Sequence, residues 1–397
     1  QGWKCMRSKS DKKKSLVPRL RFPEFREAGA WEVKRLGDVC EVLDNLRKPV
    51  ARTKRNPGPY PYYGASGAID YIDQYIFDER LLLIGEDGAK WLPYEKTAFI
   101  VEGQYWVNNH AHVLRPTLAI DTLLENYLTA LDISQHITGA APPKLTLDNL
   151  RLIWVPLPPK RDEQQKIAHC LSSLDEVIGL QAKKVQALKQ HKKGLMQQLF
   201  PAEGETTPRL RFPEFREAGA WEVKRLGEVA DVVAAGDLNV DDYSTERTDK
   251  YIFPIYSNSV AKKGLYGFCA TPKYKENSVT VTARGTLGVA FHRNCNFAAI
   301  GRLLVISNLN VVNPYFLQEI WNHSVQLPLE DGGIPQLTAV KAKPAKVAFP
   351  RNTHEQQKIA HCLSSLDEVI GLESHKLDAL KNLKKGLMQQ LFPQEVA

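Results

Sequence analysis

The chain has 397 residues, of which 43% are hydrophobic and 25% are charged, an ordinary composition for a globular protein of two or three domains. It contains no run of 18 apolar residues and no apolar stretch behind the lysines near its start, so we expect neither a membrane-spanning helix nor a signal peptide. The formal net charge of +8 favours a polyanionic partner such as nucleic acid, although many basic proteins carry such a charge only for solubility.

The chain opens on a basic segment, residues 1–15, with six lysines and arginines against one aspartate. We interpret this segment as a disordered tail. The six cysteines of the chain form no CxxC pair, which predicts free thiols in a reducing, cytoplasmic environment.

The rest of the chain is built on an internal repeat. The segment PRLRFPEFREAGAWEVKRLG, residues 18–37, recurs without a change as residues 208–227. Residues 162–201 and 354–393 share EQQKIAHCLSSLDEVIGL and KKGLMQQLFP, at an offset of 192 residues. A repeat of this length defines the architecture, which is an opening segment, a domain and a helix, each occurring twice.

Between the repeated segments lie two variable stretches, residues 38–161 and 228–353, which are similar in length but differ in sequence almost everywhere. Both contain short β-type runs and turn signals, such as YPYYGASGAIDYI in the first and SVTVTARGTLGVAFH in the second. We predict mixed, mostly antiparallel sheets with a few helices, among them residues 121–131 and 315–323.

The repeated segments after each variable stretch predict long helices with a narrow apolar stripe at coiled-coil spacing, suited to one partner helix. About 38 residues at about 1.5 Å rise give a rod of roughly 57 Å. We expect the two helices to pack antiparallel, with the ends of the chain close together. Polar residues interrupt the stripe at Gln181 or Glu373 and at Lys192 or Lys384. The predicted seam consists of Ile167, Leu171, Leu174, Ile178, Val185, Leu188, Leu195, Leu199, Ile359, Leu363, Leu366, Ile370, Leu377, Leu380, Leu387 and Leu391.

The predicted fold class is α+β, with two domains of mixed, mostly antiparallel sheet joined by two long helices in a pseudo-twofold antiparallel coiled coil. The boundaries are residues 1–161 for the tail and first domain, 162–201 for the central helix, 202–353 for the second domain and 354–397 for the C-terminal helix. Capping boxes are predicted at the helix starts, at Asp162 with Gln165 and at Thr353 with Gln356. The opening segments (residues 18–37 and 208–227) and the two long helices form a repeated frame, whereas the domains between them diverge. This pattern indicates two reading domains of different specificity.

The chain resembles the specificity (S) subunit of type I restriction-modification systems. The likeness lies in the EQQKIAxxLSSLDEVI helices with their KKGLMQQLFP ends, in the RFPEF…WEVKRLG openings, and in YPYYGASGAI and YWVNNHAHVL of the first domain. The resemblance implies two target recognition domains, each reading one half of a bipartite site in double-stranded DNA. It also implies docking of two methyltransferase subunits that methylate adenine, and of restriction subunits with motor and nuclease activity.

The same resemblance implies that the chain is not itself an enzyme and holds no cofactor or metal, because S-adenosylmethionine, ATP and Mg²⁺ would bind to the partner subunits. It cannot supply the target bases, which depend on the variable domains. The polar faces of both helices are repeated as well, and we predict that each recruits one methyltransferase subunit, with plain solvation as the alternative. These faces include Gln164, Gln165, Lys166, Asp175 and Glu176.

Two other functions are weighed against this one. The chain has no methyltransferase signature, no GxxxxGK[ST] phosphate loop and no HExxH motif, so a self-contained enzyme is disfavoured. A nuclease site could be sought at Glu86, Asp87 and Lys90, but two carboxylates on one turn are common by chance and the second domain has no equivalent. A structural adaptor whose domains bind peptides would not require the basic charge.

Candidate DNA contacts follow from basic and aromatic residues at loops and turns. Residues 45–58 form a basic, proline-containing loop followed by tyrosines, for which a merely solvated loop is the alternative. The basic residues of the second domain stand at turns between strands, where surface charge alone is an equal explanation. His110 and His112 are interpreted as structural. The candidates are Arg47, Lys48, Arg52, Lys54, Arg55, Tyr62, Tyr63, Ser66, Asn258, Lys262, Lys263, Lys273, Lys275, Arg284, His292 and Arg293.

Overall fold

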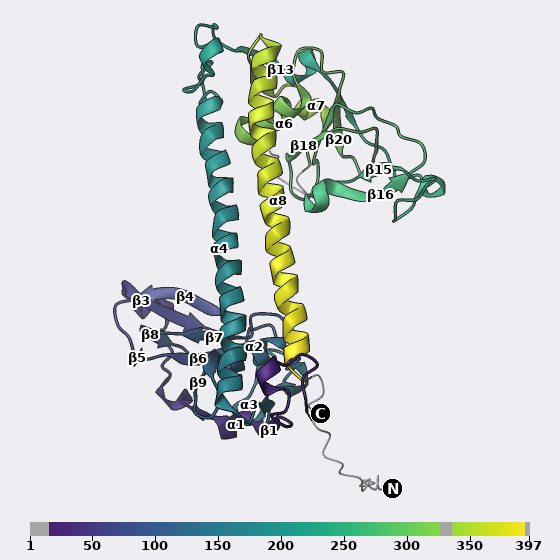
Figure 1. Cartoon of the computed structure of the whole chain (residues 1–397). Helices are drawn as coiled ribbons and strands as arrows, with labels where there is room; N and C mark the ends of the chain where they lie inside the picture. The colour runs from purple at the N-terminus through teal and green to yellow at the C-terminus, as the bar shows by residue number, and fades with distance from the viewer. Residues whose placement is uncertain (1–15, 326–335, 394–397) are drawn as a thin grey trace. The chain divides into compact units, whose positions relative to one another are not determined.

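The computed structural model describes residues 16–325 and 336–393, which form two units (Figure 1). The first unit comprises Gln1–Ala182 with His375–Ala397, and the second comprises Lys183–Ser374. The predicted basic tail lies outside the described residues. Across the described residues, no helix has the length and apolar character needed to cross a membrane, and the cysteines are free thiols.

The two long helices are α4 (Arg161–Leu199) and α8 (Thr353–Leu391), each of 39 residues. Neither predicted capping box forms. Helix α4 already begins at Arg161, and at the start of α8 it is the Asn352 side chain that accepts a hydrogen bond from the His354 N–H at 3.0 Å. The prediction failed because any short polar residue near a helix start resembles a cap in sequence.

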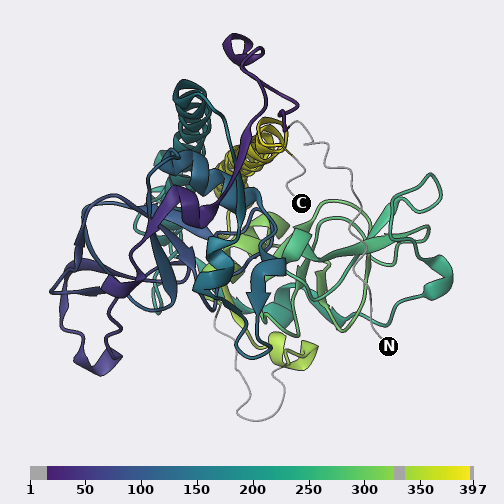
Figure 2. The ribbon, with the colours of Figure 1, turned by 90° about the horizontal axis from the view of Figure 1, so that it is seen from below.

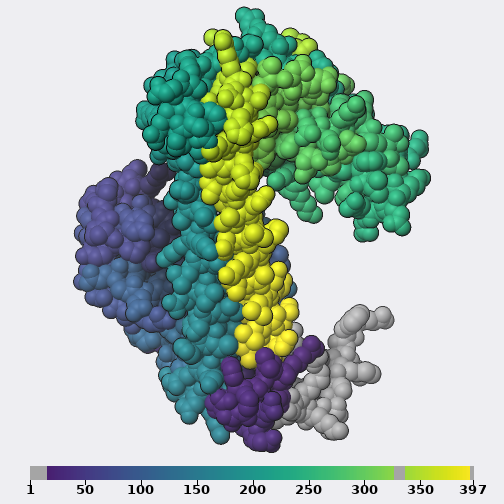
Figure 3. Space-filling view, turned by 45° about the horizontal axis from the view of Figure 1, so that its top comes forward, coloured from purple at the N-terminus to yellow at the C-terminus, as the bar shows by residue number. Residues whose placement is uncertain are grey.

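Parts of α4 and α8 lie side by side and antiparallel within each unit (Figure 3). In the first unit the Lys384 Nζ lies 2.6 and 2.7 Å from the two carboxylate oxygens of Asp175. In the second unit the Lys192 Nζ lies 2.8 Å from both carboxylate oxygens of Asp367. The two lysines that interrupt the apolar stripe therefore pair with repeat-equivalent aspartates of the facing helix, which favours one register over others.

The predicted seam residues are all buried or half-buried. Those near the helix ends also belong to the domain cores: Ile167, Leu171 and Leu391 pack in the core of the first unit, and Leu199 and Ile359 in that of the second. The helices are therefore part of each domain as well as a link between domains.

The first unit contains two four-stranded sheets and two two-stranded ribbons. The sheet orders are β2-β9-β6-β7 and β4-β3-β8-β5, and the ribbons are β1-β12 and β10-β11. Only the β3 and β8 pair is parallel among the pairs of these sheets. The elements are β1 (Glu32–Arg35), α1 (Leu36–Val39), β2 (Cys40–Val42), β3 (Pro57–Gly64), β4 (Gly67–Ile72), β5 (Phe77–Asp78), β6 (Leu81–Gly85), β7 (Ala98–Val101), β8 (Gln104–Val107), β9 (Ala111–Pro116), α2 (Asp121–Ala130), β10 (Ile137–Thr138), β11 (Lys144–Leu145), α3 (Leu147–Arg151) and β12 (Trp154–Leu157).

Strand β6 shows how these layers form. Leu82 and Ile84 face the core shared with α2 and the long helices, whereas Leu81 and Leu83 face a second core against β5 and β8. Because side chains alternate along a strand, an uninterrupted apolar run is what a strand buried on both faces requires. In this unit the sheets lie beside the long helices, with the β3–β4 hairpin at the far side (Figures 1 and 2).

The second unit repeats this plan with a different sequence. Its sheets are β14-β20-β17-β18 and β16-β15-β19, its ribbon is β13-β21, and the β15 and β19 pair is again parallel. The elements are β13 (Glu222–Arg225), α5 (Leu226–Val229), β14 (Asp231–Ala234), β15 (Phe253–Tyr256), β16 (Leu265–Cys269), β17 (Ser278–Val281), β18 (Ala290–Arg293), β19 (Ala298–Ala299), β20 (Leu304–Ser307), α6 (Pro314–Ser324), α7 (Ala339–Ala342) and β21 (Lys346–Phe349). The fold class is therefore α+β, as predicted, and the predicted helices at 121–131 and 315–323 correspond to α2 and α6.

The opening segments are fixed to the long helices by a buried ion pair. In the first unit the Arg21 guanidinium donates two hydrogen bonds of 2.7 Å to Glu163, and the Trp31 Nε1–H donates a third at 3.3 Å. In the second unit Arg211 donates to Glu355 at 2.7 and 2.9 Å. The glutamate side chains are fully buried, so each pair holds a repeated arginine on a repeated helix.

One contact of the opening segment recurs in both units. In the second unit the chain runs from α4 into the opening segment, and the Leu210 N–H donates to the Gln198 carbonyl at 2.9 Å. In the first unit the equivalent residues lie far apart in the sequence, yet the Leu20 N–H donates to the Gln390 carbonyl at 3.0 Å. The repeat thus forms the same contact whether or not its two segments follow one another in the sequence.

A circular permutant should therefore fold. We expect this for a chain in which a second copy of residues 202–207 connects Pro393 to Pro18 and the new ends lie between Gly204 and Glu205 of the original copy, because that loop is exposed. Its melting temperature should match that of the native chain. The matched control opens α4 between Gly179 and Leu180 and should melt at a much lower temperature. A permutant opened at Gly204 that melts as low as the control would contradict the equivalence of the two junctions.

Candidate nucleic-acid interface

In the first unit, three exposed basic residues lie on a loop that is supported from beneath. Arg52 and Lys54 belong to a short 3-10 turn (Arg52–Lys54), and Lys48 precedes this turn. The supporting residue is Arg55, whose Nε–H donates to the Val50 carbonyl at 2.9 Å and whose guanidinium lies 4.2 Å from the centre of the Tyr62 ring. The loop therefore presents cations to solvent from a fixed backbone.

Arg55 and Tyr62 are themselves wrong as predicted DNA contacts. Arg55 is half-buried and pairs with Asp70 at 3.0 Å. Tyr62 is 1% exposed, and its hydroxyl accepts a hydrogen bond from the Val50 N–H at 2.9 Å. Tyr63 is also packed inward, with its ring against Phe99 and Tyr105 in the second core. Sequence shows that these residues stand beside a basic loop but not that they form its base.

Arg47 does not belong to the exposed surface either. Its guanidinium pairs with Asp44 at 3.1 Å and with Glu86, while the Lys144 Nζ lies 2.6 Å from the other oxygen of Glu86. The His112 Nδ1 lies 2.5 Å from Asp44. Burial alone would raise the pKa of both carboxyls, but these partners hold the pKa of Asp44 and of Glu86 below their ordinary values. Arg47 was wrongly predicted to contact DNA because it compensates buried carboxylates.

Asp44, Glu86 and His112 also have the spacing of metal ligands, with one ligand atom from each within 4.8 Å of the others. A divalent ion would have to displace Arg47 and Lys144 from Glu86, since both cations already neutralise that carboxylate. The His112 Nε2 is also occupied, at 2.7 Å from the Leu145 carbonyl. We interpret the group as a structural ion-pair network, in agreement with the structural interpretation of His112.

The alternative nuclease residues do not converge. Glu86 faces the buried network, Asp87 lies 2.5 Å from the His110 Nδ1, and the Lys90 Nζ pairs with Glu95 at 3.6 Å. Two carboxylates and a lysine that each have a different set of partners are not arranged around one metal ion or one water molecule. These residues therefore provide no nuclease site.

Two further exposed basic residues, which were not predicted from sequence, lie beside turns. The turn of the β3–β4 hairpin carries the exposed Ser66, and the Lys96 Nζ lies 3.6 Å from the position that a Cβ on Gly67 would take. In the second unit Arg302 has a φ of 68° and follows Gly301, whose carbonyl accepts a hydrogen bond from the Asn258 side chain. Lys96 stands at a turn signal between two β-type runs and could have been found, whereas nothing in sequence reveals the position of Arg302.

In the second unit five of the predicted DNA contacts are exposed, and all lie in loops or turns that join strands: Lys262, Lys263, Lys273, Lys275 and Arg284. The other three are engaged inside the domain. Asn258 bonds to Gly301 and accepts a hydrogen bond from the Ala283 N–H at 2.7 Å, His292 packs against Tyr315, and Arg293 is 3% exposed. The prediction of Arg293 as a direct contact is wrong because its side chain is buried, whereas the half-buried Asn258 and His292 stay predictions.

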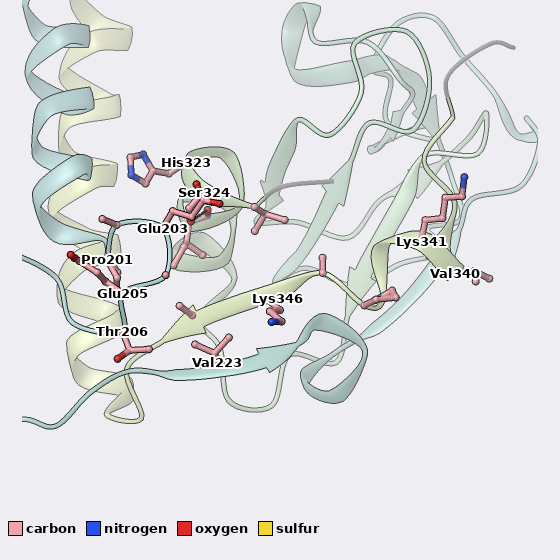
Figure 4. A pocket seen from close by; sticks show the side chains of 17 residues that line it. Pro201, Glu203, Glu205, Thr206, Val223, His323, Ser324, Val340, Lys341 and Lys346 are labelled. Carbon is pink, nitrogen blue, oxygen red and sulfur yellow. Dashed lines mark hydrogen bonds between the residues drawn. The ribbon is translucent and has the colours of Figure 1, made fainter. Parts of the chain in front are cut away.

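A cavity of about 1260 Å³ lies in the second unit (Figure 4). It is lined by the linker that carries Glu203 and Glu205, by His323 at the end of α6, and by the β13-β21 ribbon with Lys346. The burial of His323 lowers its pKa, and its ring packs against Phe200. We assign no catalytic role to this cavity.

The polar helix faces are mostly used inside the chain. Gln164 is buried, accepts a hydrogen bond from the Ile120 N–H at 3.1 Å and donates to the Pro158 carbonyl at 3.1 Å. Lys166 pairs with Glu24 at 3.2 Å, and Asp175 pairs with Lys384. The prediction that Gln164 faces a partner is wrong, because a repeated polar residue can equally serve a repeated internal contact.

The repeated side chains that remain exposed on the helices include apolar ones. On α4 they are Val177 and Leu180, which are 47% and 60% exposed. On α8 the repeat-equivalent residues Val369 and Leu372 are 41% and 70% exposed. Exposed apolar pairs that recur at the same repeat position are typical of a surface covered by a partner.

Comparison with known proteins gives a consistent result. A family model of the type I restriction modification DNA specificity domain matches twice, at residues 29–190 and 219–382. A putative type I restriction enzyme specificity subunit of Haemophilus influenzae is 34% identical over 151 residues, which are 37% of this chain and 39% of that protein. A putative type I specificity subunit of Mycoplasma pneumoniae is 24% identical over 362 residues, which are 89% of this chain and 94% of that protein.

Solved structures share the fold. The crystal structure of the S subunit of a type I restriction-modification system from M. genitalium aligns with a TM-score of 0.68 at 15% identity, covering 96% of this chain and 100% of that chain. A structure reported for complex assembly and conformational transition of the type I R-M system aligns with a TM-score of 0.50 at 18% identity, covering 92% and 98%.

Proposed function

Because the chain belongs to the type I restriction-modification DNA specificity family, we propose that it reads a bipartite DNA target with its two variable domains and docks two methyltransferase subunits. Each domain reads one half-site, and the bases between the half-sites are not read. The chain itself is non-catalytic. Adenine methylation with S-adenosylmethionine, and ATP- and Mg²⁺-dependent restriction, belong to the partner subunits.

The observation that carries this proposal is the contrast between the frame and the domains. The Arg21–Glu163 pair recurs as Arg211–Glu355, and the Lys384–Asp175 pair recurs as Lys192–Asp367. The exposed basic residues at the turns have no such correspondence between the two variable domains. One frame that carries two different basic surfaces suits the recognition of two different sequences.

Salt-dependent DNA binding separates this function from that of a structural adaptor. The complex of the chain with its methyltransferase subunits should bind duplex DNA with an affinity that falls steeply as salt rises, because each phosphate contact releases counterions. Binding that is absent, or insensitive to salt, would favour the adaptor. The chain alone, supplied with S-adenosylmethionine or Mg²⁺, should show no activity.

The exposed apolar pairs on α4 and α8 support two equivalent docking sites for methyltransferase subunits. Leu180→Glu alone, or Leu372→Glu alone, should reduce the complex from two methyltransferase subunits to one, and the double variant should bind none. A charge placed in the centre of an apolar contact commonly lowers affinity about tenfold or more. The native fold should persist because both side chains are exposed.

Light scattering measures the mass of each complex. Leu383→Glu is the matched control, since Leu383 is 59% exposed on α8 but its repeat-equivalent on α4 is His191. It should leave the two-to-one complex intact. Unchanged stoichiometry in the Leu180 and Leu372 variants would place the docking surface elsewhere.

A further inference from the structure

The loop between β15 and β16 holds two lysines in a left-handed backbone conformation. The φ angle is 48° at Lys262 and 53° at Lys263, and Gly264 follows with a φ of 84°. Residues with a Cβ rarely adopt this conformation, because the Cβ crowds the following carbonyl oxygen. Both lysines are exposed, so burial of their own side chains does not enforce it. The surrounding structure must hold the backbone in place.

Arg293 provides that support from inside the domain. Its Nη2–H donates to the Lys263 carbonyl at 2.9 Å, and its Nε–H donates to the Thr280 hydroxyl at 2.9 Å. The guanidinium lies 3.5 Å from the centre of the Tyr256 ring. These three contacts restrict the motion of the Arg293 side chain. They therefore hold the Lys263 carbonyl, which precedes Gly264 and β16, in place.

Gly264 closes the loop from the other side. Its carbonyl accepts a hydrogen bond from the Ser257 N–H at 2.8 Å. A Cβ at this glycine would stand 2.7 Å from the Ser257 carbonyl oxygen, so no larger residue fits without moving the turn. The two lysines therefore project from a backbone that is fixed at both ends.

The positive charge of this loop has no internal counter-ion. Arg293 is 3% exposed, yet among the described residues no carboxylate pairs with it or with the two lysines. Burial lowers the pKa of Arg293 to about 10, and burial together with the charges of Arg293 and Lys263 lowers the pKa of His292. The half-buried Arg47 of the first unit differs, because Asp44 and Glu86 compensate it. An uncompensated cluster of this kind suits a polyanion that arrives from solvent.

We propose that Arg293 is a positioning residue that holds Lys262 and Lys263 against the phosphate backbone of duplex DNA at the half-site read by the second domain. The inference rests on the proposed function and adds to it the residues that set this contact. Phosphate is the expected ligand because an ammonium group is a compact point charge without the planar fork that reads base edges. A prearranged loop also lowers the ordering cost of binding.

A double-mutant cycle tests the proposal in the complex of the full chain with its methyltransferase subunits. Lys262→Asn with Lys263→Asn removes both charges, while asparagine tolerates the left-handed backbone. This variant should lower affinity for target DNA about tenfold or more. It should also reduce the slope of log affinity against log salt concentration by about 2. Lys343→Asn, at an exposed lysine after α7, is the control and should change neither quantity.

Arg293→Lys should lower affinity for the same DNA and raise the KM for DNA in the methylation assay without changing kcat. In the background that already lacks the lysine pair it should have no further effect. Additive losses would show that Arg293 acts only on folding and would overturn its positioning role. If Arg293→Lys unfolds the domain, Gly264→Ala serves instead, because it displaces the loop without removing Arg293 or either lysine.

The outcomes also separate this inference from the proposed function. If the native complex binds DNA in a salt-dependent manner but loss of the lysine pair changes neither affinity nor slope, the lysines do not contact phosphate and only the inference fails. If the native complex shows no salt-dependent DNA binding, the proposed function itself fails.

Discussion

Exchanging residues 38–161 for the variable domain of another family member should replace one half of the methylated DNA motif and leave the other half unchanged. The frame holds each domain through apolar side chains at the helix ends and also through hydrogen bonds to backbone atoms, which any sequence can supply. Gln164 binds the Ile120 N–H and the Pro158 carbonyl, and Gln356 binds the Asn313 N–H at 2.7 Å and the Pro350 carbonyl at 2.8 Å. A grafted domain can therefore meet the same two helices.

The readout is the motif in which adenines become methylated in cells that express the complete system. The reciprocal exchange of residues 228–353 is the matched control and should change the other half only. An exchange that alters both halves, or neither, would show that the variable domains do not read the half-sites independently.

Glu163→Ala should destabilise the first unit strongly. The substitution leaves the Arg21 guanidinium buried without its carboxylate, and breaking a buried pair in this way costs about 3–5 kcal/mol. For a unit of this size, the first unfolding transition should fall by roughly 6–20 °C. Calorimetry on the full chain measures this change, and Glu355→Ala should do the same to the second unit.

The matched control is Lys166→Ala, one turn further along α4. Lys166 pairs with Glu24, but both side chains are about half exposed, and an exposed pair contributes about 0–1 kcal/mol. Its melting temperature should stay near that of the native chain. Equal effects of Glu163→Ala and Lys166→Ala would mean that the buried pair does not hold the opening segment on the helix.

The frame could be predicted from sequence because it depends on patterns that are local or repeated. Heptad spacing over four heptads predicts a long helix whatever surrounds it. Both α4 and α8 begin one residue before the predicted range; α4 ends two residues before the predicted end, and α8 ends at Leu391, before the predicted end at residue 397. The apolar run at β6 predicts a strand buried on both faces. Gln164 was misread because a polar residue that bonds to distant backbone groups has the same sequence signature as one that faces a partner.

The candidate interface was predicted only in part, for a different physical reason. Sequence shows that Arg47 lies in a basic loop, but its partner Glu86 is 39 residues away and meets it only through the β-sheet. Arg293 was chosen for its charge, and its burial depends on β18 pairing with β17 in one register. The exposure of a surface lysine such as Lys262 depends on no distant partner residue, and Lys262 is exposed as expected. Its left-handed backbone conformation could not be predicted from sequence.

We propose that one chain carries two domains that read DNA sequence independently. The most direct measurement is single-molecule mapping of methylated adenines in DNA from cells that express this chain with its partner subunits. We expect a motif of two unrelated short half-sites separated by a fixed number of unread bases. A contiguous or palindromic motif, or methylation without sequence preference, would contradict it.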